Sequence, residues 1–151
     1  MATHQYPVTV EWTGGRDGQG KVQAIRSGAC VGIAVPPEFQ GTGSGSNPEE
    51  LLACAVAGCY SITFGIIAAN RKLALQSLAV EAIGEVEQKG ASFVYTKIVI
   101  KPSIVLSSGS DEAMSALAKD IAMKTDSYCI ITNTIRDKVL VEVEPSITVA
   151  S

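Results

Sequence analysis

The most reactive side chains in this sequence are its four cysteines, Cys30, Cys54, Cys59 and Cys129. Cys59 lies near the middle of an apolar stretch, where a thiol is most often a small buried hydrophobic side chain. Such surroundings disfavour the thiolate, so Cys59 can act as a nucleophile only if a cation lies close to it. Cys129 is expected near the start of a short helix, which would lower its pKa and make it a better attacking or leaving group. We interpret Cys30 and Cys54 as core side chains.

A cation for Cys59 has to come from elsewhere in the chain, and Arg16 is the candidate. It lies in a glycine-rich turn at residues 13–18, TGGRDG, which would present its side chain rigidly, although an ordinary solvated arginine fits the same turn. Glu49 could orient Arg16, act only as an acid in the first turn of a helix, or do both. Glu49 and Cys59 are ten residues apart. That spacing is about 15 Å along a helix, so the arginine would have to reach between them.

The element that positions Glu49 and Cys59 is a helix predicted over residues 47–70. Asn47 is a good N-cap residue, Pro48 suits the first helical position, and Glu50 can reach back in a variant of the capping box. The helix is apolar on every face, which is typical of a helix buried on every face. Its length would also suit a membrane span, but its Ala- and Gly-rich composition favours a central helix wrapped by sheet. So much covering from one chain of 151 residues suggests that a second subunit contributes.

Segments of alternating hydrophobicity surround this helix and predict the order βββ-α-ββ-α-(short α)-β. The predicted strands lie at residues 5–12, 20–27, 30–35, 76–88, 92–105 and 138–149. An amphipathic helix capped by Ser110 follows the fifth strand, and Ser127 could cap a short helix that ends at Ile135. The pattern predicts an α+β fold with largely antiparallel sheets, in one domain that spans residues 1–151.

Charge, the N-terminal segment and the cysteines indicate which partners and which cellular compartment to expect. A net charge of −3 without a basic cluster argues against a nucleic-acid partner. The N-terminal segment has neither the basic nor the apolar region of a signal peptide, so we expect a cytoplasmic protein without a membrane partner. Cysteines in that compartment are more often catalytic, redox-active or buried than paired in structural disulfides. Without a CxxC pair, and with His4 as the one histidine, we expect no metal site.

Three stretches together resemble the OsmC/Ohr family, the osmotically inducible and organic hydroperoxide resistance proteins. They are TGGRDG at 13–18, GSNPEELLACAVAGC at 45–59, and the lone Cys129 before the closing strand. The resemblance covers almost the whole chain in order, and the GGRDG turn is closer to the Ohr branch than to OsmC proper. It implies an intertwined homodimer, in which antiparallel sheets wrap long central helices and the active sites lie at the subunit interface.

The resemblance also implies a role for each candidate residue. Cys59 matches the family's peroxidatic cysteine and Cys129 its resolving cysteine, Arg16 the arginine set against the thiolate, and Glu49 the glutamate that orients that arginine. The implied activity is a thiol peroxidase that reduces organic hydroperoxides without a metal or bound organic cofactor. The implied reductant is a dithiol such as a dihydrolipoyl group.

Two features depart from the family pattern and indicate a divergent branch. Ile130 follows the second cysteine, where the family commonly has proline, and Cys54 is an unusual neighbour of Cys59. The alternative function is a non-catalytic dimeric protein that binds a small apolar ligand on the same scaffold, with its cysteines buried. Titration of the thiols separates the two hypotheses, because one equivalent of hydroperoxide should remove two thiols per chain from a peroxidase and none from a binding protein.

The role implied for Arg16 can be tested by substitution. We expect Arg16→Ala and Arg16→Lys to slow the reaction of the Cys59 thiol with peroxide about a hundredfold or more, with little effect on stability. Lysine keeps the charge but loses the planar fork that both Glu49 and a peroxide could use. Stopped-flow measurement of the oxidation rate is the test, and a change of less than about twofold would show that Arg16 is only a surface residue of the turn.

Overall fold

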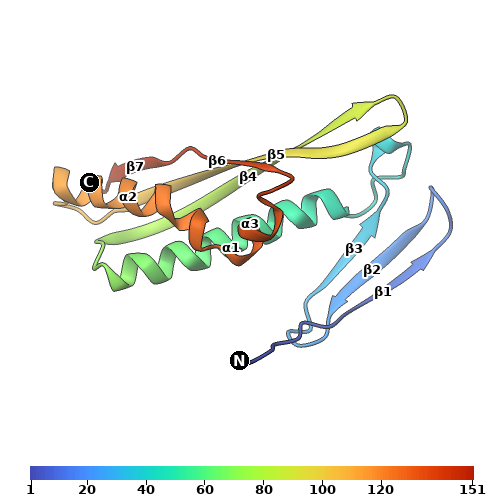
Figure 1. The fold of residues 1–151 in the computed structure, drawn as a ribbon, viewed down its shortest axis with the longest axis horizontal. Helices are drawn as coiled ribbons and strands as arrows, with labels where there is room; N and C mark the ends of the chain where they lie inside the picture. The colour runs from blue at the N-terminus through green and yellow to red at the C-terminus, as the bar shows by residue number, and fades with distance from the viewer. The chain divides into compact units, whose positions relative to one another are not determined.

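The computed structural model describes all 151 residues and divides into two compact units, Met1–Leu51 and Leu52–Ser151 (Figure 1). Each unit contains its own β-sheet, and the helices α1, α2 and α3 lie wholly or mainly in the second unit. The order of strands and helices confirms the predicted α+β fold class. The assignment of residues 1–151 to one domain stays a prediction.

The first unit is built on an antiparallel sheet in the order β1-β2-β3. Its strands are β1 (Val8–Thr13), β2 (Gln19–Ala24) and β3 (Cys30–Ala34). The turn between β1 and β2 needs glycine at residue 18, because a Cβ atom there would lie 2.4 Å from the carbonyl oxygen of Thr13. A short 3₁₀ helix, η1 (Pro37–Phe39), follows the sheet. The Arg16 turn is therefore a tight connection between paired strands, as its glycines predict.

Strand β1 carries apolar side chains that nothing in the chain covers. Val8 is 60% exposed and Val10 is 56% exposed, and Trp12, on the same face, is also exposed. Alternating apolar residues are typical of a half-buried strand, but within the single chain every residue of β1 is exposed. Exposed apolar side chains on one sheet face are a liability in water, and a partner that covered them would remove it.

Helix α1 (Pro48–Asn70) begins as the sequence predicts. The backbone N–H of Glu50 donates to the Asn47 side-chain oxygen at 2.9 Å, which confirms Asn47 as the N-cap residue. The capping-box variant is wrong, because the Glu50 carboxylate accepts a hydrogen bond from the Ser46 hydroxyl at 2.8 Å. The preceding loop therefore supplies a second polar contact for the first turn of α1.

The second unit contains a sheet built around a long hairpin of β4 (Leu75–Lys89) and β5 (Ser92–Leu106). On the other edge of β5 lie β6 (Leu140–Val143) and β7 (Ser146–Val149), one after the other and both parallel to β5. The closing strand expected at 138–149 is thus two strands, separated at Glu144 and Pro145. Proline has no N–H group to donate to the ladder, which accounts for a break there.

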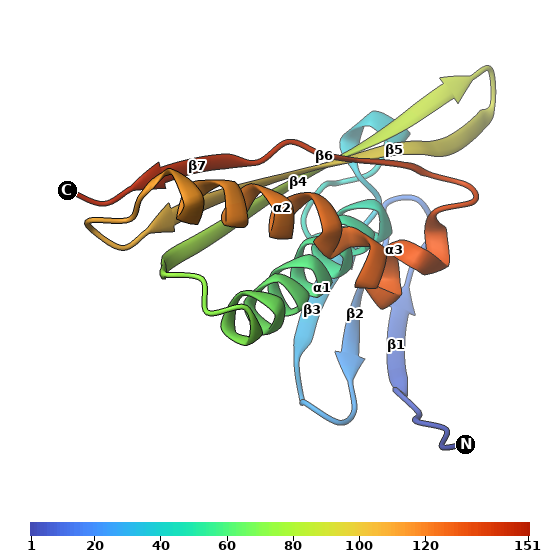
Figure 2. The ribbon, with the colours of Figure 1, turned by 60° about the vertical axis from the view of Figure 1, so that its left-hand side comes forward.

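Two further helices complete the second unit, α2 (Glu112–Tyr128) and α3 (Ile130–Ile135). The N-cap residue of α2 is Asp111, whose side-chain oxygen accepts the Met114 N–H at 2.9 Å. Ser110 is therefore not the cap, and its hydroxyl instead donates to the Ser107 carbonyl at 2.7 Å. Helices α1 and α2 lie side by side on one face of the sheet, as Figure 2 shows.

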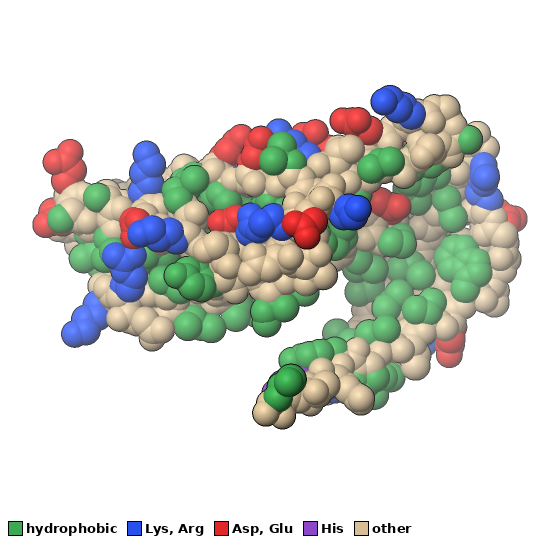
Figure 3. Space-filling model, viewed as in Figure 1, with side chains coloured by type: hydrophobic (Ala, Val, Ile, Leu, Met, Phe, Trp, Pro, Cys, Tyr) green, Lys and Arg blue, Asp and Glu red, His purple; other side chains and the backbone are tan.

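The core of the second unit forms between the two long helices and β5. Its largest buried side chains are Tyr60, Phe64, Ile98, Ile100, Ile104, Leu106 and Ile121. Helix α1 buries only one stripe of side chains, at residues 56, 60, 64 and 68. On another face Ile62 is 68% exposed and Ile66 is 58% exposed, and Figure 3 shows green hydrophobic side chains along this part of the surface. One chain alone therefore does not bury α1 on every face, and the cover expected from a second subunit stays a prediction.

Length and composition alone would also let α1 cross a membrane, a test that the core helix of a soluble protein passes as well. The window of α1 that meets this test is 22% buried inside the chain. Its buried stripe belongs to the core that it shares with α2 and β5.

The uncovered apolar faces on β1 and α1 predict a stable homodimer. We expect light scattering to give twice the chain mass of 15.7 kDa, with no dissociation on dilution to micromolar concentration. Permanent interfaces bury upwards of about 2,000 Å², which is the reason to expect slow separation. A particle with the mass of one chain at micromolar concentration would contradict this prediction.

Candidate active site

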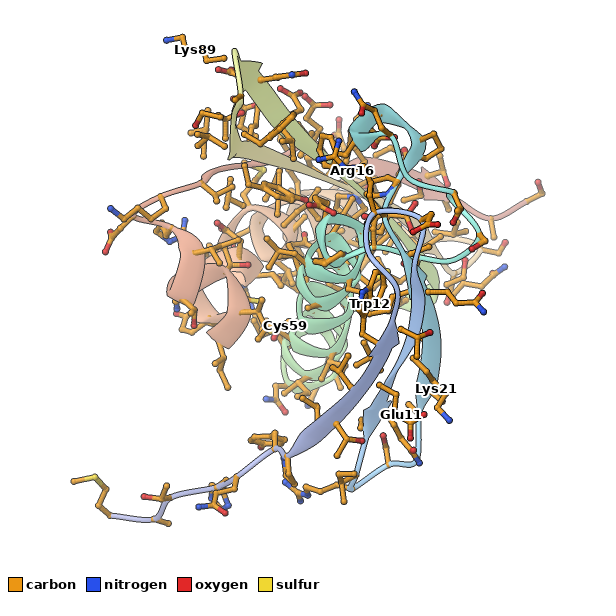
Figure 4. All side chains as sticks on the ribbon, turned by 90° about the vertical axis from the view of Figure 1, so that its right-hand side faces the viewer. Glu11, Trp12, Arg16, Lys21, Cys59 and Lys89 are labelled. Carbon is orange, nitrogen blue, oxygen red and sulfur yellow. The ribbon has the colours of Figure 1, made fainter.

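Cys59 is half-buried on α1, and its neighbour Tyr60 determines which way it faces. The Tyr60 ring is fully buried and stacks on Phe64, and its hydroxyl donates to the carbonyl of Ala122 on α2 at 2.7 Å. This contact fixes the rotation of α1 against α2. Successive helical residues point about 100° apart, so anchoring Tyr60 also fixes the direction of Cys59. Figure 4 shows Cys59 on the side of α1 that faces the C-terminal helices.

Cys129 is fully buried at the junction between α2 and α3, where it is the N-cap residue of α3. Its backbone N–H donates to the Asp126 carbonyl at 3.2 Å, and its sulfur accepts the N–H of Thr132 at 3.4 Å. The prediction that Ser127 caps this helix is wrong, because the Ser127 hydroxyl donates to the Lys124 carbonyl inside α2. A thiol thus takes the place of the usual oxygen cap.

Polar contacts between the end of α2 and α3 hold this junction in place. Arg136, at the end of α3, donates to both the carboxylate and the carbonyl oxygen of Asp126, at 3.1 and 3.0 Å. The Asn133 side-chain amide donates to the Ser127 carbonyl at 2.8 Å. Because both ends of the junction are tied, the position of Cys129 does not depend on a single short helix.

The surroundings of Cys59 favour its thiolate. Burial raises the pKa of this thiol, but hydrogen bonding to the sulfur from the Cys129 thiol lowers it, as do the N–H groups of Ile131 and Ile130 and the Thr63 hydroxyl. The lowering contributions prevail, so the pKa of Cys59 lies below the ordinary value for cysteine. The half-buried Cys59 thiol therefore interacts with four donors, all of them in the second unit.

The pKa of Cys129 moves in the opposite direction. Burial raises it, and so does the hydrogen bond that the thiol makes to Cys59, while the hydroxyl and N–H of Thr132 lower it. The net effect is a raised pKa, so the expectation of a lowered pKa for Cys129 is wrong. The short helix α3 directs the N–H groups of its first two residues at Cys59 instead. When the pair carries one proton, these opposite shifts favour that proton on Cys129 and the negative charge on Cys59.

A thiolate in hydrogen-bonding contact with a thiol can carry out two-electron chemistry. The thiolate attacks an electrophilic atom, and if its sulfur becomes oxidised the neighbouring thiol can displace the oxygen and form a disulfide. The two thiols already interact, so little movement is needed for that step. Both cysteines of this pair belong to the second unit.

The other two predicted site residues belong to the first unit. The Arg16 guanidinium donates to the side-chain oxygen of Gln40 at 2.9 Å, and the arginine is exposed. Glu49 lies in the first turn of α1 and is half-buried. Their action on Cys59 stays a prediction.

The remaining thiols do not behave as expected, because Cys30 and Cys54 are exposed rather than in the core. No group of three or more His, Cys, Asp or Glu side chains gathers closely enough to hold a metal ion.

Sequence reasoning missed Thr63, Thr132 and the N–H groups that contact Cys59. Their spacing in the sequence was the available signal. Thr63 comes four residues after Cys59, which puts both on one helix face, and Thr132 comes three residues after Cys129, the spacing of a helix cap.

Both a protein family and a relative from Bacillus subtilis match the sequence of this chain. Residues 41–144 match the family described as OsmC-like protein. The chain is 32% identical over 147 residues to YmaD of Bacillus subtilis, an uncharacterised protein, and the match covers 97% of each chain.

Solved structures share the fold at lower identity. An organic hydroperoxide resistance protein from Legionella pneumophila is 22% identical, with a TM-score of 0.70 over 99% of this chain and 100% of that one. An organic hydroperoxide resistance protein from Elizabethkingia anophelis is 20% identical, with a TM-score of 0.67 over 99% of both chains. An OsmC-like protein from Vibrio cholerae is 18% identical, with a TM-score of 0.76 over 94% of this chain and 100% of that one.

The opposite pKa shifts of the two thiols can be measured without any peroxide. In a Cys30→Ser/Cys54→Ser background, we expect the rate of Cys59 alkylation by iodoacetamide to persist to lower pH than for an ordinary cysteine, because its pKa is lowered. Cys129→Ala removes the first of the donors to Cys59, so the midpoint of the pH–rate curve should move upward. Cys129→Ser keeps a donor and should move it less. A midpoint at the ordinary cysteine value, unchanged in Cys129→Ala, would contradict the assigned contacts.

Proposed function

The chain belongs to the OsmC-like protein family, and from that premise we propose that it is a cysteine-based thiol peroxidase that reduces organic hydroperoxides to alcohols. The observation that carries the proposal is the Cys59–Cys129 pair, in which the pKa of Cys59 is lowered and the pKa of Cys129 is raised. Two of the solved structures with this fold are named organic hydroperoxide resistance proteins, which supports the choice of substrate.

The first step of the proposed reaction is attack of the Cys59 thiolate on the terminal oxygen of the hydroperoxide. A sulfur–oxygen bond forms and the oxygen–oxygen bond breaks, so Cys59 becomes a sulfenic acid and the organic part leaves as an alkoxide that takes up a proton. The donors that lower the pKa of Cys59 keep the nucleophile charged before the attack.

In the second step Cys129 resolves the sulfenic acid. The Cys129 sulfur, after losing its proton, attacks the Cys59 sulfur, the sulfur–oxygen bond breaks, and the hydroxide leaves with that proton as water. An external dithiol then reduces the disulfide by exchange, and we propose a dihydrolipoyl group as its chemical type. No metal or bound organic cofactor takes part in this scheme.

Arg16 and Glu49 complete the proposed site. The Arg16 guanidinium would stabilise charge on the peroxide oxygens and on the thiolate, and the Glu49 carboxylate would hold it in a two-pronged pairing. We also propose that the protein works as a homodimer, since α1 and β1 leave apolar side chains uncovered. The proposed compartment is the cytoplasm.

The surroundings of Cys59 support an organic rather than an inorganic peroxide. Several apolar residues near it in sequence, among them Val56 and Phe64, point into the core and cannot contact a substrate. A cleft of about 570 Å³ does open one turn further along α1, lined by Thr63, Ile66, Ile67, Arg71, Ile121, Lys124 and Tyr128. Its three isoleucines would stabilise the alkyl part of a substrate by about 0.8 kcal/mol for each methylene removed from water.

The test of the proposed function is a thiol titration with the two cysteines replaced in turn. One equivalent of cumene or tert-butyl hydroperoxide should remove two thiols per chain from the native protein, and faster than hydrogen peroxide does. Cys59→Ser should abolish peroxide consumption, because serine cannot form the sulfenic acid. Cys129→Ser should complete one turnover and stall, with the sulfenic acid trapped by a dimedone-type reagent.

Cys54→Ser is the matched control, since it removes an exposed cysteine from the same helix and should leave the rate unchanged. Full steady-state activity in Cys59→Ser would end the proposal. Unchanged thiols in the native protein after addition of hydroperoxide would instead favour a non-catalytic binding protein.

A further inference from the structure

The side chain of Thr132 is fully buried, and its hydroxyl oxygen makes no well-formed hydrogen bond. A buried hydroxyl without a partner costs free energy, and replacement by an apolar group of the same shape would remove that cost. Thr132 lies in the first turn of α3, three residues after Cys129. The Thr132 hydroxyl therefore lowers the stability of the folded protein, and it lies next to one of the two reactive sulfurs.

Three other hydroxyl groups on the helices of this chain donate hydrogen bonds to backbone carbonyls. The hydroxyls of Ser61, Thr125 and Thr134 each donate to the carbonyl four residues earlier, at 2.7, 2.7 and 2.8 Å. Thr132 makes no such bond, because the residue four places before it, Tyr128, precedes the start of α3 at Ile130. The position of Thr132 in the first turn thus leaves its hydroxyl available to a different acceptor.

The sulfur of Cys129 is that acceptor. The Thr132 N–H already donates to it at 3.4 Å, which fixes the residue against the sulfur. The Thr132 hydroxyl is also close enough to lower the pKa of the Cys129 thiol. A neutral thiol is a weak acceptor, so the hydroxyl gains little in the reduced protein. A thiolate is a charged acceptor, and hydrogen bonds to charged groups are about twice as strong as neutral ones.

We propose that Thr132 is a catalytic residue of the resolving step, in which its hydroxyl donates a hydrogen bond to the Cys129 sulfur while that sulfur carries negative charge. This inference rests on the proposed peroxidase function. As the Cys129 thiolate attacks the oxidised Cys59, the S–S bond forms and the S–O bond breaks, and the hydroxide leaves as water with the proton that Cys129 gave up, while Thr132 keeps its own proton throughout. When a dithiol later attacks Cys59 in the disulfide, Cys129 leaves as a thiolate and meets the same donor.

The charges around Cys129 explain why this donor matters after Cys59 is oxidised. In the reduced protein the negative Cys59 sulfur raises the pKa of Cys129. Oxidation to the sulfenic acid removes that charge, and the donors on Thr132 then act without opposition from it. Asp126 on α2 lies just before Cys129, but its carboxylate is paired with Arg136. Thr132 is thus the group that favours ionisation of Cys129 when resolution requires it.

The experiment compares Thr132→Val, Thr132→Ser and a control, Thr134→Val, on the same helix. Each protein is mixed with excess cumene hydroperoxide over a range of pH and quenched at intervals. Mass spectrometry then separates the thiol, sulfenic acid and disulfide forms. Thr132→Val should form sulfenic acid at the native rate but convert it to disulfide about tenfold more slowly, the effect of one lost bond to a charged group. Thr132→Ser and Thr134→Val should resolve at close to the native rate.

The pH profile distinguishes a catalytic from a packing role. Loss of the hydroxyl raises the pKa of Cys129, so the profile of the resolving step in Thr132→Val should move to higher pH, and the deficit should shrink once Cys129 is fully ionised. Stability should be equal or greater in Thr132→Val, and Thr132→Ala provides the same comparison if valine prevents folding.

Resolution by Thr132→Val at the native rate at every pH would overturn the proposal, as would equal slowing in Thr132→Val and Thr132→Ser. A native protein that forms no sulfenic acid at all would instead refute the peroxidase function.

Discussion

A helix begins with a few N–H groups that have no partner inside the helix. In α3 the sulfur atoms of Cys59 and Cys129 accept the first of these N–H groups. Cys59 takes the N–H groups of Ile130 and Ile131, and Cys129 takes that of Thr132. The pKa values of the two thiols therefore move in opposite directions. The Cys59 sulfur receives two backbone donors as well as the Cys129 thiol, whereas Cys129 is fully buried beside the negative Cys59 sulfur. Direct contacts rather than a helix dipole account for the effect, since α3 has only six residues.

The rest of the second unit serves to bring these groups together. Tyr60 ties α1 to α2 through the carbonyl of Ala122, and Arg136 ties α3 to the end of α2 through Asp126. The C-terminal end of α3 leads directly into β6, which pairs with β5 in the sheet beneath both long helices. Each side of the thiol pair is therefore anchored to a different part of the same core. A small shift of α1 against α3 would separate the Cys59 sulfur from its donors.

Local sequence patterns predicted the elements well and the site less well. Asn47 and the spacing of apolar residues located α1, because caps and periodicity depend on near neighbours. The pairing of Cys59 with Cys129 followed from family resemblance, and their opposite pKa shifts could not be predicted. Those shifts depend on contacts between α1 and α3, which are distant in sequence, and on a cap made by sulfur rather than oxygen. Hydrophobicity also showed that α1 and β1 have faces that need covering, but not which chain covers them.

The donors that α3 offers to Cys59 have a consequence for redox equilibrium. In the reduced protein the Cys59 sulfur accepts from the N–H groups of Ile130 and Ile131, so part of the stability of the first turn of α3 depends on that sulfur being a good acceptor. A disulfide sulfur accepts hydrogen bonds less well than a thiolate, and any free energy that α3 loses on oxidation makes the reduced form the more stable one. Stabilisation of the reduced form raises the reduction potential of a dithiol pair. A disulfide at this position would therefore be readily reduced, as a bond that must open in every cycle requires, in contrast to the resistant disulfides that hold secreted proteins together.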